Sequence, residues 1–294
     1  MKKPDTKIAQ YHLHKAHPEK LQFELYDLNA YRKKSGGQAA KAHSHSYYQI
    51  IWFFDEGGTH VVDFQTFDIR KNTILFIAKD QIHAFDANLE VNGWLIHFNE
   101  SFFMHSDVDI FLKYNIFNSQ QNPCYAIDSE TAKIGTFYIS LIAGELTQKH
   151  RFGHGEIIRF LLKAFLINFE RVHLGNTEKN LEINSQYELQ FYKLKELVEY
   201  NYAKGLSVID YADMLNISAR TLTTITKAHA NKSTSKLISE RVILEAKRLL
   251  KFTTLQVGEV AYKTGFDDAS YFVKYFKRHV GSSPSAYRNA QSPE

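Results

Sequence analysis

The sequence predicts an α+β protein, in which a β-rich N-terminal half is followed by an all-α C-terminal domain. Residues 21–128 contain short β-prone runs separated by turn residues, a pattern typical of a sandwich or barrel. From residue 129 onward, apolar residues recur at the three- and four-residue spacing of amphipathic helices. With 294 residues, 44% of them hydrophobic, the chain is long enough for two folded domains.

These patterns divide the chain into four segments. We predict a domain of strands at residues 1–128, a helical pair at 129–174, a polar linker at 175–186 and a helical domain at 187–290. No apolar run reaches the length of a membrane span, and the single cysteine, Cys124, excludes an intrachain disulfide. We therefore expect a cytoplasmic protein without a membrane partner.

The most informative stretch is residues 257–288, near the C-terminus. Gly265 ends a short helix there, because glycine enters the left-handed C-cap conformation without a steric penalty. An aspartate just after it can cap the next helix, on which Phe272 and Phe276 form an i,i+4 pair suited to a core. The outer face of this second helix is basic. A helix, a glycine turn and a basic helix form the geometry that places a recognition helix in a DNA major groove.

A first unit of the same kind precedes this stretch. Ser207 caps a helix that ends near Leu215, Asn216 provides the turn, and Ser218 caps the following helix. Residues 234–252 then form one long helix between the two units. The side chains of the helix after Ser218 that we expect to face DNA are Arg220, Thr223, Thr224 and Lys227.

The charge of the chain is unevenly placed. From Tyr187 to the end there are 16 Lys and Arg against 11 Asp and Glu, whereas the remainder has 20 against 21. The formal net charge of +4 therefore arises in the helical domain. A local basic excess of this kind is typical of nucleic-acid binding.

The second unit resembles the signature of the arabinose-operon-regulator (AraC/XylS) family of bacterial transcription factors. The matching residues are Gly265-Phe266, Ser270-Tyr271-Phe272, Phe276-Lys277, Gly281, Ser283-Pro284 and Tyr287-Arg288. The resemblance implies a sequence-specific DNA-binding transcription regulator, not an enzyme, whose partners are double-stranded operator DNA and RNA polymerase. It also implies that the helical pair at 129–174 supplies a homodimer interface.

The resemblance also indicates the DNA-facing residues of the second unit. The base-facing positions are Ala269, Ser270, Tyr271, Val273 and Lys274, and the positions expected to contact the DNA backbone are Lys277 and Arg278. Ala269 and Val273 suit a thymine methyl group, and Lys274 suits guanine or phosphate. In the first unit, Thr224 stands where the family commonly has arginine, so we expect that helix to read bases more weakly.

Histidines mark a second candidate site, in the N-terminal half. His43 and His45 are two residues apart, so on a strand their side chains point to one face, together with Tyr47 and Gln49. His83 follows another predicted strand and could close the cluster. Three interpretations stay open: a metal site, the polar lining of a small-ligand pocket, or structural histidines.

These histidines resemble those of the two cupin motifs, with Gln49 where metal cupins place a carboxylate ligand. Since Gln49 brings no charge to balance a divalent ion, we expect a ligand pocket without metal or other cofactor. The same segment resembles the sensor domain of sugar-responsive members of the family. That resemblance implies a cupin-like β-barrel that binds a small molecule such as a sugar, with Tyr47, Trp52 and Trp94 available for stacking.

Two other classes of function are compatible with parts of the sequence. The first is a metal-dependent cupin enzyme fused to a DNA-binding module, which a tightly bound divalent metal would support. The second is a plain interaction module, which would show no salt-dependent DNA binding.

Overall fold

The computed structural model describes residues 8–35, 37–86, 90, 92–103, 115–117, 122–174 and 186–291. The chain divides into two compact units, the sheet unit (Ala9–Asn180) and the helical unit, most of which is Leu181–Glu294. The predicted linker at 175–186 lies outside the described residues, apart from residue 186.

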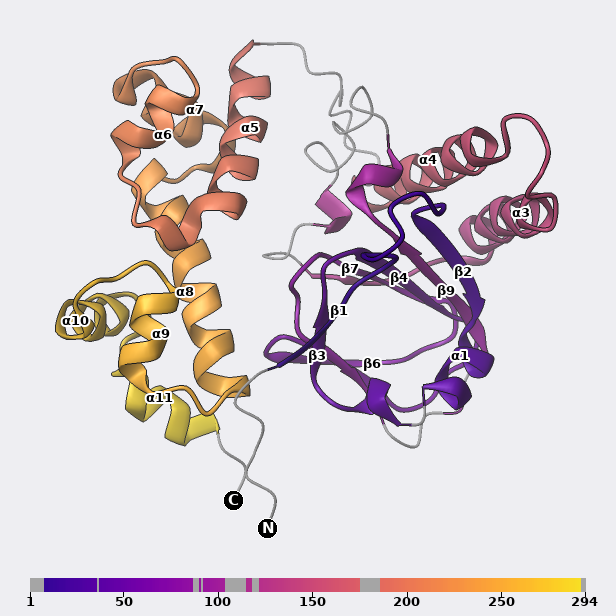
Figure 1. Cartoon of the computed structure of the whole chain (residues 1–294), viewed down its shortest axis with the longest axis horizontal. Coiled ribbons are helices and arrows are strands. Elements are labelled where there is room, and N and C mark those ends of the chain that lie inside the picture. Colours follow the sequence, from indigo (N-terminus) through magenta and orange to yellow (C-terminus); the bar gives the residue numbers. More distant parts are fainter. Residues whose placement is uncertain are drawn as a thin grey trace. The chain divides into compact units, whose positions relative to one another are not determined.

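The sheet unit contains two five-stranded sheets (Figure 1). The described strands are β1 (Ala9–Tyr11), β2 (Phe23–Asp27), β3 (His43–His45), β4 (Tyr48–Phe53), β5 (Thr59–Val62), β6 (Gln65–Asp68), β7 (Thr73–Ile77), β8 (His83–Phe85), β9 (Gly93–Phe98) and β10 (Cys124–Ala126). The first sheet has the order β1-β3-β8-β5-β6 and the second β10-β7-β4-β9-β2. The pair β1–β3 is parallel, and the other described pairs are antiparallel.

The described strands do not close into a barrel, which corrects the expected cupin-like barrel. The edge strands explain this: β1 exposes all three of its residues, and β6 exposes three of its four. Short strands that face solvent leave the edges of a sheet open. The α+β class, with a helical C-terminal domain, is confirmed.

A helical pair, α3 (Ser129–Leu146) and α4 (His154–Leu174), packs on one face of the second sheet (Figure 1). A Cβ on Gly135 would lie 2.7 Å from the Trp52 ring, so the glycine permits the close approach of α3 to β4. Residues in this core layer include Ile50, Trp52, Phe98, Ile139, Ile142, Leu162 and Phe165.

The opposite face of the second sheet lines a second core layer, between the two sheets. Along β4, Ile51 and Phe53 belong to this layer, and Val62 and Phe85 join it from the first sheet. Shorter helices complete the unit: α1 (Leu28–Lys34) and the 3₁₀ helices η1 (Gln38–Ala40), η2 (Glu100–Phe102) and η4 (Asn115–Phe117).

The helical unit holds the two predicted helix-turn-helix units. Its helices are α5 (Gln186–Asn201), η5 (Tyr202–Lys204), α6 (Val208–Met214), α7 (Ala219–Ala230), α8 (Thr234–Phe252), α9 (Val257–Lys263), α10 (Ala269–Val280) and α11 (Pro284–Gln291). The first unit is α6–α7 and the second is α9–α10. Helix α8 joins them, because Leu237 and Ile238 pack in the core of the first unit and Ala246 and Leu250 in that of the second.

Local signals place these helices where the sequence predicts them. Ser207 forms a capping box with Asp210, and the Ser218 hydroxyl accepts the Thr221 backbone N–H. Gly265 has φ +89°, and a Cβ there would lie 2.7 Å from the Ala203 carbonyl oxygen, so only glycine fits this turn.

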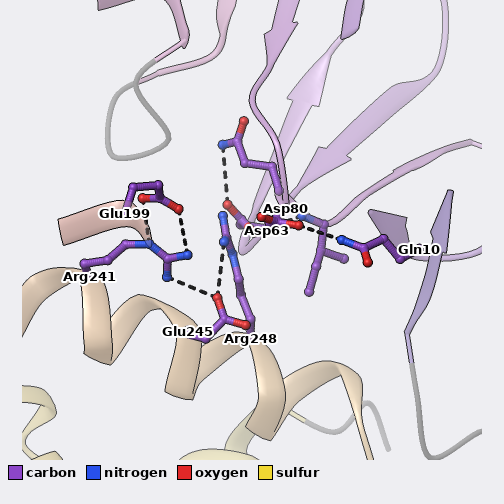
Figure 2. A network of polar contacts seen from close by, with 9 residues as sticks. Gln10, Asp63, Asp80, Glu199, Arg241, Glu245 and Arg248 are labelled. Carbon is purple, nitrogen blue, oxygen red and sulfur yellow. Dashed lines mark hydrogen bonds and ion pairs between the residues drawn. The ribbon is translucent and has the colours of Figure 1, made fainter. Parts of the chain in front are cut away.

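Helix α8 also carries a buried arginine. The Arg241 guanidinium donates two hydrogen bonds to Glu199 of α5, each 2.8 Å long, and one of 3.1 Å to Glu245 (Figure 2). It lies 3.8 Å from the centre of the Tyr202 ring. This network ties α5 and η5 to the long helix.

Candidate functional site

The outer face of α7 presents one stripe of predicted site residues. The exposed members, at i, i+3, i+4 and i+7, are Arg220, Thr223, Thr224 and Lys227. The opposite face is buried through Leu222 and Ile225, which fixes the direction of the stripe.

The outer face of α10 is similar but more basic. Its exposed predicted residues are Ala269, Ser270, Tyr271, Lys274, Lys277 and Arg278. Val273 is half-buried, because it packs against the core around Phe272 and Phe276. The Asp268 carboxylate caps the first turn, and Gly281 ends the helix with φ +87°.

The cations on these two faces are not paired with acids in the described helical unit. The ion pairs found there involve Lys232, Arg241 and Arg248 instead. The charges on α7 and α10 therefore face solvent, where they can neutralise DNA phosphates.

The structure brings the predicted histidines of the sheet unit together. Ligand atoms of His43, His45 and His83 all lie within 4.8 Å of one another, and all three side chains are buried. His83 Nε2 is 3.2 Å from His45 Nδ1, and His83 Nδ1 is 3.1 Å from Nε2 of a further histidine, His60. His43 Nδ1 donates to the Lys41 carbonyl oxygen at 2.7 Å, because a carbonyl oxygen can only accept, and this fixes the proton on Nδ1.

Burial keeps these imidazoles neutral. It lowers the pKa of His45 and His83 well below the ordinary histidine value, and it lowers the pKa of His60 to about 3. Repulsion between the histidines, which would arise if two of them became protonated, lowers the pKa of His45 and His83 further. Neutral imidazoles can donate and accept hydrogen bonds or bind a metal.

Two more of the predicted residues lie beside the cluster. The Tyr47 ring stacks on His45 with 4.4 Å between ring centres, and lies 4.7 Å from a fifth histidine, His97. Gln49 is buried and pairs with His97 in the register of β4 and β9. Burial lowers the pKa of His97, and the Glu24 carboxylate opposes that shift.

A cavity of about 210 Å³ opens next to this cluster. Its lining is Tyr11, Tyr26, Tyr31, Lys34, Ser35, Gln38, Ala39 and His43. His43 thus belongs both to the histidine cluster and to the cavity wall. Three tyrosines with a few polar groups form a lining suited to a small polar ligand.

The two tryptophans lie elsewhere. Trp52 and Trp94 pair across β4 and β9, and both pack on the face covered by the helical pair. Residues at the alternate positions, such as Ile51 and Leu95, face the other sheet. Neither tryptophan is therefore placed to stack on a ligand beside the histidines, in contrast to our expectation.

His60, His97 and the three cavity tyrosines were not among the site residues predicted from the sequence. A weak signal existed for the histidines, because His60 and His97 have the strand parity of the core residues Val62 and Leu95. The tyrosines come from β1, β2 and α1, so only the tertiary fold brings them together.

Comparison with known proteins agrees with the helix-turn-helix geometry of the helical unit. Residues 211–290 match the family described as "Helix-turn-helix domain". The raffinose operon transcriptional regulatory protein RafR of Pediococcus pentosaceus is 35% identical over 113 residues, which cover 38% of this chain and only 39% of that protein. The Msm operon regulatory protein of Streptococcus mutans is 25% identical over 240 residues, covering 81% of this chain and 83% of that protein.

A DNA complex is among the similar solved structures. The DNA-binding domain of AdpA, solved with a target DNA, is 29% identical and covers 33% of this chain and 90% of that domain, with a TM-score of 0.31.

The sequence matches and the two exposed basic helices define a DNA-binding transcription regulator. Within its C-terminal domain, residues 211–290 match a helix-turn-helix domain, as the resemblance implied. In the described part of the chain, no helix combines the length and the apolar character needed to cross a membrane.

Proposed function

We propose that the chain is a cytoplasmic, ligand-responsive regulator without catalytic activity or resident cofactor. Residues 1–128 sense a small molecule, 129–174 form a dimer interface, 175–186 link the parts, and 187–290 bind operator DNA. The observation that carries this proposal is the pair of exposed, unpaired basic faces, on α7 and α10, held by the single helix α8.

In this proposal, both helices enter the DNA major groove. One rigid rod holds them, so they read successive grooves about 34 Å apart. Lys277 and Arg278 contact phosphates and set the position of α10, while the residues earlier on that helix contact bases. An effector in the sheet unit favours one arrangement of the chain, and thereby changes operator affinity or contact with RNA polymerase.

The cavity beside the histidines is the proposed effector site. Tyrosine rings can cover the apolar face of a sugar, while Gln38 and His43 bind its hydroxyl groups. Sugars are the first class to test, because one similar protein is named for a raffinose operon.

Thermal unfolding with a panel of simple sugars tests this site. A ligand at a hundred times its dissociation constant stabilises the folded chain by about 2.7 kcal/mol, which raises the melting temperature measurably. Tyr31→Ala should abolish the shift, whereas Tyr200→Ala, which alters an exposed tyrosine of α5, should keep it. An equal shift in both variants would show that the effector binds elsewhere.

The histidine cluster supports a second candidate, a divalent transition-metal site. The donor set fits: the three imidazoles are neutral, and the bond to Lys41 leaves Nε2 of His43 unprotonated. The 3.2 Å between His83 Nε2 and His45 Nδ1 is close to the spacing of two nitrogens on one zinc ion, about 3.3 Å for bonds of about 2.0 Å. Such a metal would favour the alternative function, a metal-dependent cupin enzyme joined to a DNA-binding module.

Cobalt absorption spectroscopy tests the metal candidate. If the cluster binds metal, Co²⁺ should give ligand-field bands that His83→Ala removes and His150→Ala, outside the cluster, retains. A wild-type chain that shows no bands, and no thermal shift with Zn²⁺, would rule this candidate out.

The helical pair carries an exposed apolar surface that suits a homodimer. Its members are Ile134, Phe137 and Leu141 on α3 and Ile157 and Phe160 on α4. Patches of this kind usually mark an interface. Light scattering should give twice the chain mass of 34.1 kDa for the wild type and one chain mass for Phe137→Asp. Dimers of unchanged affinity in that variant would place the interface elsewhere.

A further inference from the structure

The two threonines on the outer face of α7 have their hydroxyl groups engaged. Thr223 Oγ1 donates to the Ala219 carbonyl oxygen at 2.8 Å, and Thr224 Oγ1 donates to the Arg220 carbonyl oxygen at 3.1 Å. Both side chains are nevertheless exposed. This is the back-bonded arrangement of a helical threonine, in which the hydroxyl lies against its own helix.

This arrangement decides which chemistry α7 presents outward. A threonine hydroxyl has one proton to donate, and here that proton is already used within the helix. The other branch at Cβ is a methyl group, so the middle of the exposed stripe is aliphatic. Arg220 and Lys227 flank this patch at the two ends of the stripe.

Helix α10 has an aliphatic side chain at the matching position. Each helix has 12 residues, and the fifth is Thr223 in α7 and Val273 in α10. Valine and a back-bonded threonine have nearly the same shape. The two units thus present a branched aliphatic group at the same point of the proposed recognition surface.

We propose that α7 reads thymine through the methyl groups of Thr223 and Thr224, as Val273 does in α10. Thymine is the only base that presents a methyl group in the major groove, so an aliphatic patch there selects T·A pairs. The inference rests on the proposed role of α7 and α10 as recognition helices. From the sequence we expected α7 to read bases weakly, because Thr224 stands where the family commonly has arginine. Under this inference α7 instead prefers T·A pairs.

The experiment begins with a selection of duplexes from a random library by the full-length chain. In the selected site, each thymine is then replaced by deoxyuridine, which lacks only the methyl group. Removal of one buried methyl group should weaken binding about fourfold, from the transfer free energy of such a group. Sensitive thymines should appear in both half-sites.

Matched variants of α7 assign the thymines to their side chains. Thr224→Val and Thr223→Val keep the methyl groups and should bind the selected site as the wild type does. Thr224→Ser and Thr223→Ser keep the hydroxyl groups but lack the methyl group. Each serine variant should bind about fourfold more weakly and should no longer distinguish thymine from deoxyuridine at the one position that its side chain contacts, while the other sensitive thymines stay sensitive. All four substitutions retain an exposed side chain of similar size, and circular dichroism checks the fold.

The opposite pattern overturns the inference: serine variants that bind normally, valine variants that do not, or deoxyuridine without effect. If DNA binding still depends on Lys274 in that case, only the methyl inference fails. If no sequence is selected at all, the proposed recognition helices fail with it.

Discussion

Replacing Lys274, Lys277 and Arg278 together by alanine is expected to weaken DNA binding about a hundredfold at physiological salt. Each cation contributes on the order of 1 kcal/mol as a phosphate or base contact, and all three are exposed without an acidic partner in the described helical unit. Phosphate contacts do not depend on sequence, so a mixed-sequence duplex of about 30 base pairs suffices for an anisotropy titration.

The salt dependence of the same titration reports how many DNA phosphates these three cations neutralise. The plot of log affinity against log salt should be less steep for the triple variant than for the wild type, by roughly 2.7 in slope, if all three cations neutralise phosphates in the wild type. A control removes the same charge from exposed lysines of the sheet unit, by alanine at Lys71, Lys133 and Lys149. If the control weakens binding as much as the α10 variant, net charge and not the face of α10 controls affinity.

Arg241→Ala is expected to destabilise the helical unit by about 3 kcal/mol. The side chain is 2% exposed and makes three hydrogen bonds to two carboxylates. Burial opposes its charge, but the Glu199 carboxylate outweighs burial and raises the pKa of Arg241. Removing one partner of a buried pair usually costs about 3–5 kcal/mol, and Glu199, at 42% exposed, can be partly rehydrated, which favours the lower end.

Urea unfolding measured by circular dichroism of the helices tests this value. Tryptophan fluorescence would report the other unit, since Trp52 and Trp94 lie in the sheet unit. The matched control is Lys232→Ala, which breaks the 2.8 Å Lys232–Glu240 ion pair, whose lysine side chain is 38% exposed. Such exposed pairs contribute under about 1 kcal/mol. Equal destabilisation of the two variants would mean that the Arg241 network does not hold α5 to α8.

The helical unit could be predicted from the sequence because its signals are local. Caps such as Ser207 and Ser218 act within three residues, and Gly265 needs only its own backbone angle to end α9. The apolar period then orients α7 and α10, so their exposed residues follow from the sequence.

The sheet unit could be predicted only in part, because its contacts are distant in sequence. All six residues of β4 are buried, so no polar alternation shows which face Trp52 occupies. The neighbours of the histidines depend on pairing such as His43 with His83, forty positions apart. The open sheet edges likewise depend on strands that fail to meet, which no local pattern encodes.

The most direct test of the central claim is the duplex selection with the full-length chain, followed by footprinting of the selected site. One rod that carries two recognition helices predicts two protected major-groove segments on the same side of the DNA, about one helical turn, or 10 base pairs, apart. A single protected segment, or no enrichment over the starting library, would contradict the account.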